Sequence, residues 1–215
     1  MSSPRARAVS GIGIDFDNTL VSYDAVFHRV ALEQGRIPAH LPPSKLAVRE
    51  HLRGSGREHE WTAMQGYVYG ARMREAEAYP GALQFLAWAR GAGIPVSIVS
   101  HKTLHPFAGP QYDLHAAARG WIEASLRDAK GALVEPQRVF FEITQQDKLR
   151  RVAQIGCDYF IDDLPEILAH GAFPQRVQRI LFDPERSHGA PAEMIVAAEW
   201  GAIRRLFEEP WNFPG

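Results

Sequence analysis

The chain has 215 residues, of which 46% are hydrophobic and 23% are charged, and its formal net charge at pH 7 is −1. This composition is typical of a globular protein with one sizeable domain, and the near-zero net charge argues against a nucleic-acid-binding surface. No apolar run approaches the roughly 20 residues that span a bilayer, and the basic N-terminal segment has no apolar stretch behind it. We therefore expect a cytoplasmic protein that binds neither nucleic acid nor membrane.

The first predicted strand is GIGIDF, from Gly11. The chain between Leu20 and Pro80 then lacks a convincing strand, although a strand and its helix are usually joined by only about 2–6 residues. Helical patterns occur in SYDAVFHRVALEQG and REHEWTAMQGYVYGARMREAEA, with turn-like segments between them. We therefore expect residues 21–79 to form a small all-helical lobe inserted after the first strand, and residues 1–20 and 80–215 to form the core domain.

Helices and strands alternate in the rest of the chain. The predicted strands are IPVSIVS from Ile94, RVFFEIT from Arg138, CDYFID from Cys157 and VQRILFD from Val177, and helical patterns lie in GALQFLAWARGAG, QQDKLRRVAQIG and AAEWGAIRRLFEE. The single cysteine, Cys157, is expected to be a small buried side chain rather than a nucleophile. The alternation predicts an α/β fold, with a Rossmann-like three-layer core around a five-stranded parallel sheet.

Unusual polar residues stand where the predicted strands end, or at the start of the helix that follows: Asp15, Asp17, Ser100, Lys148, Asp162 and Asp163. Ligands of parallel sheets bind beyond the carboxyl ends of the strands, so we expect these side chains at one edge. Clustered carboxylates repel one another unless a hard cation neutralises them, and carboxylate oxygens suit Mg²⁺. The hydroxyl of Ser100 and the ammonium of Lys148 would then donate hydrogen bonds to phosphoryl oxygens. The pattern predicts a Mg²⁺ site that takes a phosphorylated small molecule.

These residues also carry a family resemblance. The motifs DFDNT from Asp15, VSH with Ser100, Lys148, and IDDLPE with the pair Asp162 and Asp163 follow one another along the chain. In this order they resemble the four motifs of the haloacid dehalogenase-like superfamily, whose members are mostly Mg²⁺-dependent phosphatases. The resemblance covers the whole chain, with residues 21–79 as the helical cap. The four motifs are specific only when they occur together, since DxDxT alone occurs by chance.

The resemblance implies a role for each catalytic residue. Asp15 would be the nucleophile that forms an aspartyl-phosphate. Asp17 would protonate the leaving oxygen and then activate water, and its backbone carbonyl would bind Mg²⁺. The spacing of two residues would put both side chains on one side of an extended chain. Ser100 would hold a phosphoryl oxygen, and Lys148 would offset the charge on Asp15.

The resemblance also implies roles for Asp163, Asp162 and Thr19, whereas the polar run SHKTLHP points to His101 and Lys102. Asp163 matches the family's metal-binding aspartate and is favoured as the direct Mg²⁺ ligand, with Asp162 binding directly or through water. Thr19 is expected to hold the loop after the first strand and to line the substrate site. His101 or Lys102 would contact the substrate, against the simpler interpretation of an exposed loop. The chain departs from the family's commonest pattern at Asn18, where glycine is usual.

Other functions stay open at this point. A phosphomutase, or another phosphoryl-transfer enzyme of the family, would use the same residues. A non-catalytic binding or regulatory protein on this fold would be marked by the loss of Asp15, Asp17 or Lys148, and all three are present. A phosphonate-cleaving enzyme would need a cap lysine poised to form an imine, and Lys45, the only candidate, stands in a loop-like context. Nothing in the sequence favours a particular oligomeric state.

Overall fold

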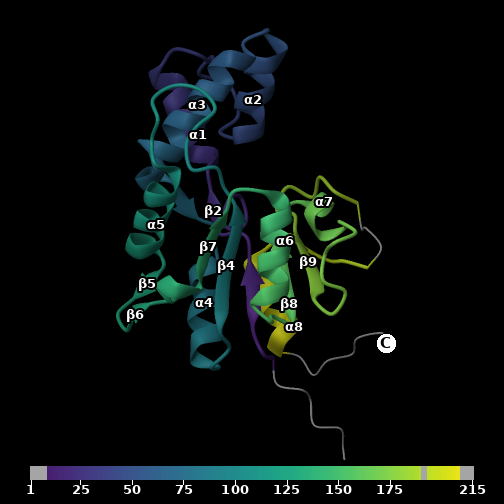
Figure 1. Ribbon diagram of the computed structural model, residues 1–215. Coiled ribbons are helices and arrows are strands. Elements are labelled where there is room, and N and C mark those ends of the chain that lie inside the picture. Colours follow the sequence, from purple (N-terminus) through teal and green to yellow (C-terminus); the bar gives the residue numbers. More distant parts are fainter. Residues whose placement is uncertain (1–8, 190–192, 209–215) are drawn as a thin grey trace, which may run out of the picture.

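A computed structural model describes residues 9–189 and 193–208 of the chain, so the aromatic tail 209–215 lies outside the described part. Its centre is a six-stranded sheet in the order β10-β9-β8-β1-β4-β7 (Figure 1). All neighbouring strands in it are parallel. The strands are β1 (Ile12–Ile14), β4 (Val96–His101), β7 (Val139–Glu142), β8 (Tyr159–Asp162), β9 (Gln178–Phe182) and β10 (Ile195–Ala197).

The sixth strand is the difference from the predicted sheet. All five predicted strands are present, and the parallel α/β fold is confirmed. However, Ala197, which was expected to open the last helix, instead ends β10, and helix α8 (Trp200–Glu208) begins at Trp200. β10 pairs only with β9, at the edge of the sheet. A strand of 3 residues is too short to show a period of two, which is why the sequence did not reveal it.

Helices cover both faces of the sheet because successive strand residues point to opposite sides. In β8, Ile161 belongs to one hydrophobic cluster and Phe160 to another. The first cluster includes buried residues of α4 (Ala82–Gly91) and α8, and the second includes those of α6 (Gln145–Gln154) and α7 (Pro165–Leu168). The result is the three-layer core that the sequence predicts. Cys157 is buried in the second cluster.

The inserted segment stands beyond the sheet, at the top of Figure 1. We call residues 21–78 the cap segment. It holds the helices α1 (Asp24–Glu33), α2 (Lys45–Gly54) and α3 (Glu58–Gly70) and the 3-10 turn η1 (Met73–Glu75). Its two ends, β2 (Val21–Ser22) and β3 (Glu77–Ala78), form an antiparallel ribbon, which adds a strand pair to the expected helices. None of the helices described has both the length and the apolar character needed to cross a bilayer.

Two helices were not anticipated. Helix α2 lies between segments with prolines and glycines that indicate turns, yet the side chain of Ser44 caps it by accepting the backbone N–H of Ala47 at 3.0 Å. Helix α5 (Leu114–Ser125) is capped in the same way by Asp113, at 2.7 Å. It is followed by the hairpin of β5 (Arg127–Asp128) and β6 (Gly131–Ala132) and by the 3-10 turn η2 (Pro136–Arg138).

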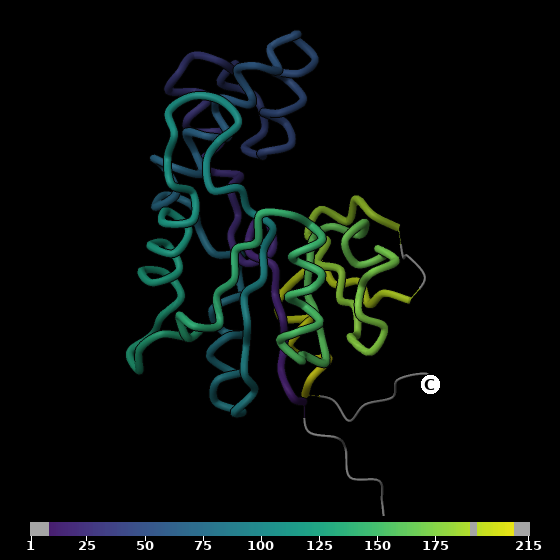
Figure 2. Tube along the Cα trace, viewed as in Figure 1, coloured from purple at the N-terminus to yellow at the C-terminus, as the bar shows by residue number. Residues whose placement is uncertain are grey.

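The connection from β4 to α5 runs beside α3, as the teal loop in Figure 2 shows. Two glycines of α3 permit this approach. A Cβ added at Gly66 would lie 2.6 Å from the Cβ of Pro106 and 2.8 Å from the carbonyl oxygen of Ala108. One added at Gly70 would lie 2.4 Å from the Cβ of Tyr112. The loop is therefore packed against the cap segment, and it begins with Lys102, which reaches the site described below.

We predict that Gly66→Ala destabilises the protein by about 1–3 kcal/mol, because the added methyl group overlaps the loop backbone. Gly120→Ala is the matched control, since a Cβ at this position of α5 would meet nothing within 4 Å. That control should leave stability unchanged or raise it by up to about 1 kcal/mol through helix propensity. Urea unfolding of the two variants and the parent measures the difference. Equal stability of both variants would contradict the packing described.

Candidate active site

Three carboxylates meet where β1 and β8 lie side by side. Asp15 directly follows β1, and its backbone N–H donates to the carbonyl of Ile161 in β8 at 2.8 Å. Asp162 ends β8, and Asp163 follows it. Carboxylate oxygens of Asp15, Asp162 and Asp163 all lie within 4.8 Å of one another. Asp15 and Asp162 are buried, so their charges cannot be dispersed by water.

The buried ammonium group of Lys148 pairs with two of these three carboxylates. Lys148, on α6, donates to Oδ1 of Asp15 at 2.6 Å and to Oδ2 of Asp162 at 2.6 Å, and its side chain is 2% exposed. Burial lowers the pKa of Lys148, but the two carboxylates more than offset this and raise the pKa overall. Burial also raises the pKa of Asp15, against the lowering effect of Lys148. The lysine therefore stays protonated between the two acids.

The third carboxylate leaves the cluster with surplus negative charge. Burial and the neighbouring Asp162 raise the pKa of Asp163 to about 7, and Thr19 donates to its Oδ1 at 3.1 Å. Both oxygens of Asp162 are engaged, since Oδ1 also accepts the backbone N–H of Leu164 at 3.0 Å. Within the described residues, hydrogen bonds reach only one oxygen each of Asp15 and Asp163. Hard oxygen donors with surplus charge suit a cation such as Mg²⁺.

Asp17 faces a different set of groups. Lys102 donates to both of its oxygens, at 2.9 and 2.8 Å, and the hydroxyl of Tyr23 donates to Oδ1. Burial raises the pKa of Asp17, but Lys102 and then Tyr23 lower it, with a net lowering. The next residue, Asn18, has a φ of 58°, in the left-handed region that glycine and asparagine favour. The asparagine thus meets the same backbone requirement as the glycine that is commonest at this point in the family pattern.

The cap segment places a second ammonium group beside this loop. Lys45 donates to Oδ1 of Asn18 at 2.8 Å, and its Nζ lies 5.6, 5.8 and 5.7 Å from the ring centres of Tyr23, Phe27 and Tyr69. The loop-like setting expected for Lys45 is wrong, because it is the first residue of α2. One indication of a role for Lys45 was present in the sequence, namely that it is the single lysine within residues 21–79.

Of the other residues expected to contact a substrate, three lie at the acidic edge and one does not. Ser100 is buried in β4, which is paired with β1. Thr19 and Lys102 reach the acids as described. His101 is exposed, and its ring nitrogen bonds to the carbonyl of Ile143 at 3.0 Å. The structure therefore brings Ser100, Thr19 and Lys102 to the acidic edge and leaves His101 at the outer end of its strand.

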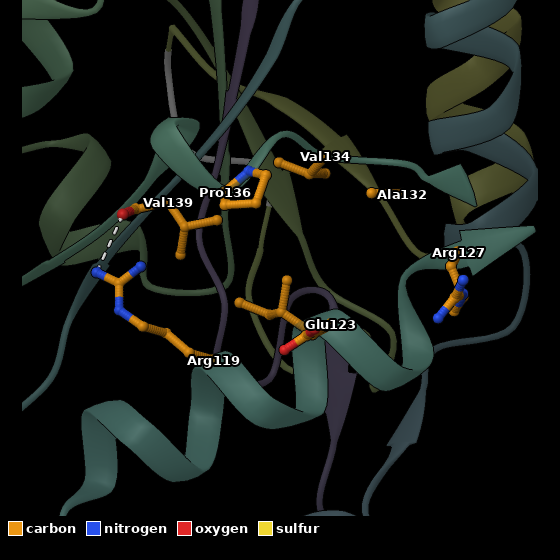
Figure 3. Close-up of a pocket in the computed structure, with 8 residues that line it drawn as sticks. Arg119, Glu123, Arg127, Ala132, Val134, Pro136 and Val139 are labelled. Carbon is orange, nitrogen blue, oxygen red and sulfur yellow. Dashed lines mark hydrogen bonds between the residues drawn. The ribbon is translucent and has the colours of Figure 1, made fainter.

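A hollow of about 390 Å³ opens beside the acids, and its lining includes Asn18, Lys45, Arg49, Asp163 and Asp183. A separate hollow of about 450 Å³ lies between α5 and the chain around η2 (Figure 3). There Arg119 donates to the carbonyl of Val139 at 3.3 Å, and none of the acids of the cluster lines the space. Of the three clustered carboxylates, Asp163 lines the first hollow, and none lines the second.

Comparisons with known proteins agree with this geometry. The family model of haloacid dehalogenase-like hydrolases matches residues 12–160. No curated protein sequence matches the chain. Similar solved structures include an L-2-haloacid dehalogenase, with 10% identity, a TM-score of 0.55 and coverage of 94% of this chain and 99% of that one. Two further structures are similar at comparable levels.

One is an archaeal β-phosphoglucomutase from Pyrococcus sp. strain ST 04, with 14% identity, a TM-score of 0.52 and coverage of 92% of this chain and 97% of that one. The other is a HAD family hydrolase from Deinococcus radiodurans R1 with bound phosphate and sodium, with 16% identity, a TM-score of 0.51 and coverage of 93% and 95%. At these identities the three structures show the shared fold.

The contacts of Lys148 lead to a prediction about stability. Lys148→Met should lower the free energy of unfolding by about 3 kcal/mol in EDTA, because it leaves two buried carboxylates without their cation. Arg150→Met, on the exposed side of the same helix, should change it little. Urea unfolding at neutral pH measures both. A small loss for both variants would contradict the buried ion pairs.

Proposed function

This chain belongs to the family of haloacid dehalogenase-like hydrolases, and we propose that it is a Mg²⁺-dependent phosphatase that hydrolyses phosphate monoesters of small molecules. The observation that carries the proposal is the pair of differently paired acids, Asp15 beside Lys148 and Asp17 beside Lys102. A halide leaves carbon without a proton, whereas the oxygen of a phosphate ester needs one. The acid at position 17 thus favours phosphoryl transfer over dehalogenation.

In the first half of the reaction, a carboxylate oxygen of Asp15 attacks phosphorus and the bond to the leaving oxygen breaks. Lys148 stays protonated and offsets the charge of Asp15. Asp17 gives a proton to the leaving oxygen, and the carboxylate must first take up this proton against the lowering effect of Lys102 and Tyr23 on its pKa. Ser100 donates to a phosphoryl oxygen. The product of this half is an aspartyl-phosphate on Asp15 and a free alcohol.

In the second half, Asp17 takes a proton from a water molecule, which attacks the phosphorus of the aspartyl-phosphate and frees Asp15. The ionised form of Asp17, which Lys102 and Tyr23 favour, is the form that this step requires. Asp15, Asp163 and the backbone carbonyl of Asp17 would hold Mg²⁺, with Asp162 as a direct or water-mediated ligand. When bound, the ion neutralises charge on the phosphoryl oxygens and the carboxylates.

The surroundings of Lys45 argue against imine chemistry. Burial lowers the pKa of Lys45, but Tyr69 and then the carboxylates of Asp17 and Asp163 raise it, with a net increase. An amine must lose its proton before it can attack a carbonyl group. The raised pKa favours the protonated form of Lys45, which disfavours imine formation and a phosphonate-cleaving enzyme.

We predict release of inorganic phosphate from p-nitrophenyl phosphate or from members of a panel of metabolite phosphates in the presence of Mg²⁺. EDTA should abolish the release, and Asp15→Asn should reduce it by at least about 10³-fold, since the nucleophile is lost. Phosphate that moves to another hydroxyl of the substrate, without release, would indicate a phosphomutase. A folded parent that binds Mg²⁺ but transfers phosphate from no compound would favour a binding or regulatory protein.

We also predict that Mg²⁺ raises the melting temperature of the parent by a few degrees, because an ion that binds only the folded state stabilises it. Asp163→Asn should lose most of this increase, since it removes a carboxylate with an oxygen available to the ion. Differential scanning fluorimetry with Mg²⁺ and with EDTA measures the increase for each protein, so each serves as its own reference. An unchanged increase in the variant would contradict the role of Asp163.

A further inference from the structure

The buried indole of Trp200, at the start of α8, reaches the loop that carries Asp15 and Asp17. Its Nε1–H donates to the backbone carbonyl of Thr19 at 3.2 Å, and the hydroxyl of Thr19 donates to Oδ1 of Asp163 at 3.1 Å. We propose that Trp200 is a positioning residue for Mg²⁺ binding, which acts on Asp163 through Thr19. This inference rests on the proposed function, because it concerns the same metal site.

Thr19 is the link between the indole and the carboxylate. Both Thr19 and Trp200 have an exposed fraction of 0%, so bulk water cannot take the place of either partner in their hydrogen bond. A buried carbonyl or hydroxyl group that loses its partner is costly. The backbone of Thr19 is therefore held by the indole, while its side chain holds Asp163.

The next residue of the loop is tied to the core in a similar way. The carbonyl of Leu20 accepts the backbone N–H of Tyr79 at 2.9 Å, and the backbone N–H of Leu20 donates to the carbonyl of Phe16 at 3.1 Å. The second of these bonds closes the turn, and the first attaches it to the chain that enters α4. The bond from Trp200 is the one that falls on the residue in contact with Asp163.

The indole itself is held in place by its neighbours. Its ring centre lies 5.0 Å from that of Phe85 on α4 and 5.6 Å from that of Phe182 on β9. A Cβ added at Gly81, just before α4, would lie 3.0 Å from the Cβ of Trp200. Close packing of this kind fixes the direction of the N–H. Trp200 lies in none of the four motifs that carry the family resemblance.

The contact with Thr19 matters for a metal ion because it engages one oxygen of Asp163. Within the described residues no hydrogen bond reaches the other oxygen, whereas both oxygens of Asp162 are engaged. Groups that hold a metal ligand orient it toward the ion, and their loss typically weakens metal binding by about 10–100-fold. Trp200 acts one contact further out, so its effect passes through the hydroxyl of Thr19.

Calorimetry with Mg²⁺, in the absence of substrate, tests the inference. Trp200→Phe removes the N–H donor and keeps an aromatic ring, and we expect it to weaken Mg²⁺ binding by at least about threefold. The matched control is Trp121→Phe, because Trp121 is also a buried indole and donates to the carbonyl of Ala76 at 2.8 Å. This control should bind Mg²⁺ as the parent does. Equal Mg²⁺ affinity of folded Trp200→Phe and the parent would overturn the inference.

A double-variant cycle shows whether the effect passes through Thr19. Thr19→Val removes the hydroxyl and should weaken Mg²⁺ binding about tenfold, whereas Thr19→Ser keeps the hydroxyl and should retain most of the affinity. Adding Trp200→Phe to Thr19→Val should then change the affinity by less than about twofold, since the link is already broken. Fully additive losses in the double variant would overturn the proposed route.

A merely structural indole would behave differently. Urea unfolding in EDTA should show Trp200→Phe and Trp121→Phe destabilised alike, and a loss of stability in Trp200→Phe without weaker Mg²⁺ binding would overturn the inference. NMR of the parent adds a measurement that needs no substitution. The indole N–H signal of Trp200 should shift when Mg²⁺ is added, and that of Trp121 should not. A Trp200 signal that stays in place at saturating Mg²⁺ would also overturn the inference.

These measurements separate the inference from the proposed function, because none of them requires turnover. Weaker Mg²⁺ binding in Trp200→Phe, with the control unchanged, supports the inference even if the parent releases no phosphate. Unchanged binding overturns it even if the parent is a phosphatase. A parent that binds no Mg²⁺ overturns it together with the metal dependence proposed above.

Discussion

The ammonium group of Lys148, buried between Asp15 and Asp162, is the contact on which the site depends. It joins β1, β8 and α6, and it allows two carboxylates to be buried side by side, which would otherwise be prohibitively costly. It cannot balance the third acid, Asp163, whose pKa is raised by burial and then by the charge of Asp162. The charge left over is what makes this edge of the sheet suitable for a metal ion.

Asp15 and Asp17 have different surroundings because β1 ends before them, so that Asp15 stays beside the sheet and Asp17 lies in the loop. Alternation along an extended chain would put Asp15 and Asp17 on one side. However, β1 ends at Ile14, and Asp17 already lies in a turn that returns to Val21. Asp15 therefore meets Lys148 of the core, while Asp17 meets Lys102 and Tyr23. Burial raises the pKa of Asp15 in spite of Lys148, whereas Lys102 and Tyr23 outweigh burial and lower the pKa of Asp17.

The sequence predicts the parts that depend on local pattern. Apolar runs reveal the five main strands, and polar residues at their ends reveal the acids, since parallel strands end at one edge. Helix α2 was missed because prolines and glycines flank it and only Val48 and Leu52 are buried. The packing of the loop from Lys102 on α3 depends on Gly66 and Gly70, whose role appears only when distant segments meet.

The cap segment contacts the core at Asp17 and at its neighbour Asn18. Tyr23, at its base, bonds to Asp17, and Lys45 bonds to Asn18. The ring of Tyr69 lies 5.7 Å from the ammonium of Lys45 and 5.0 Å from that of Lys102, so it joins the cation of the cap to that of the core. Any movement of the cap segment must therefore alter the surroundings of Asp17. Under the proposed function, binding of a substrate between cap and core would therefore be coupled to the proton transfer by Asp17.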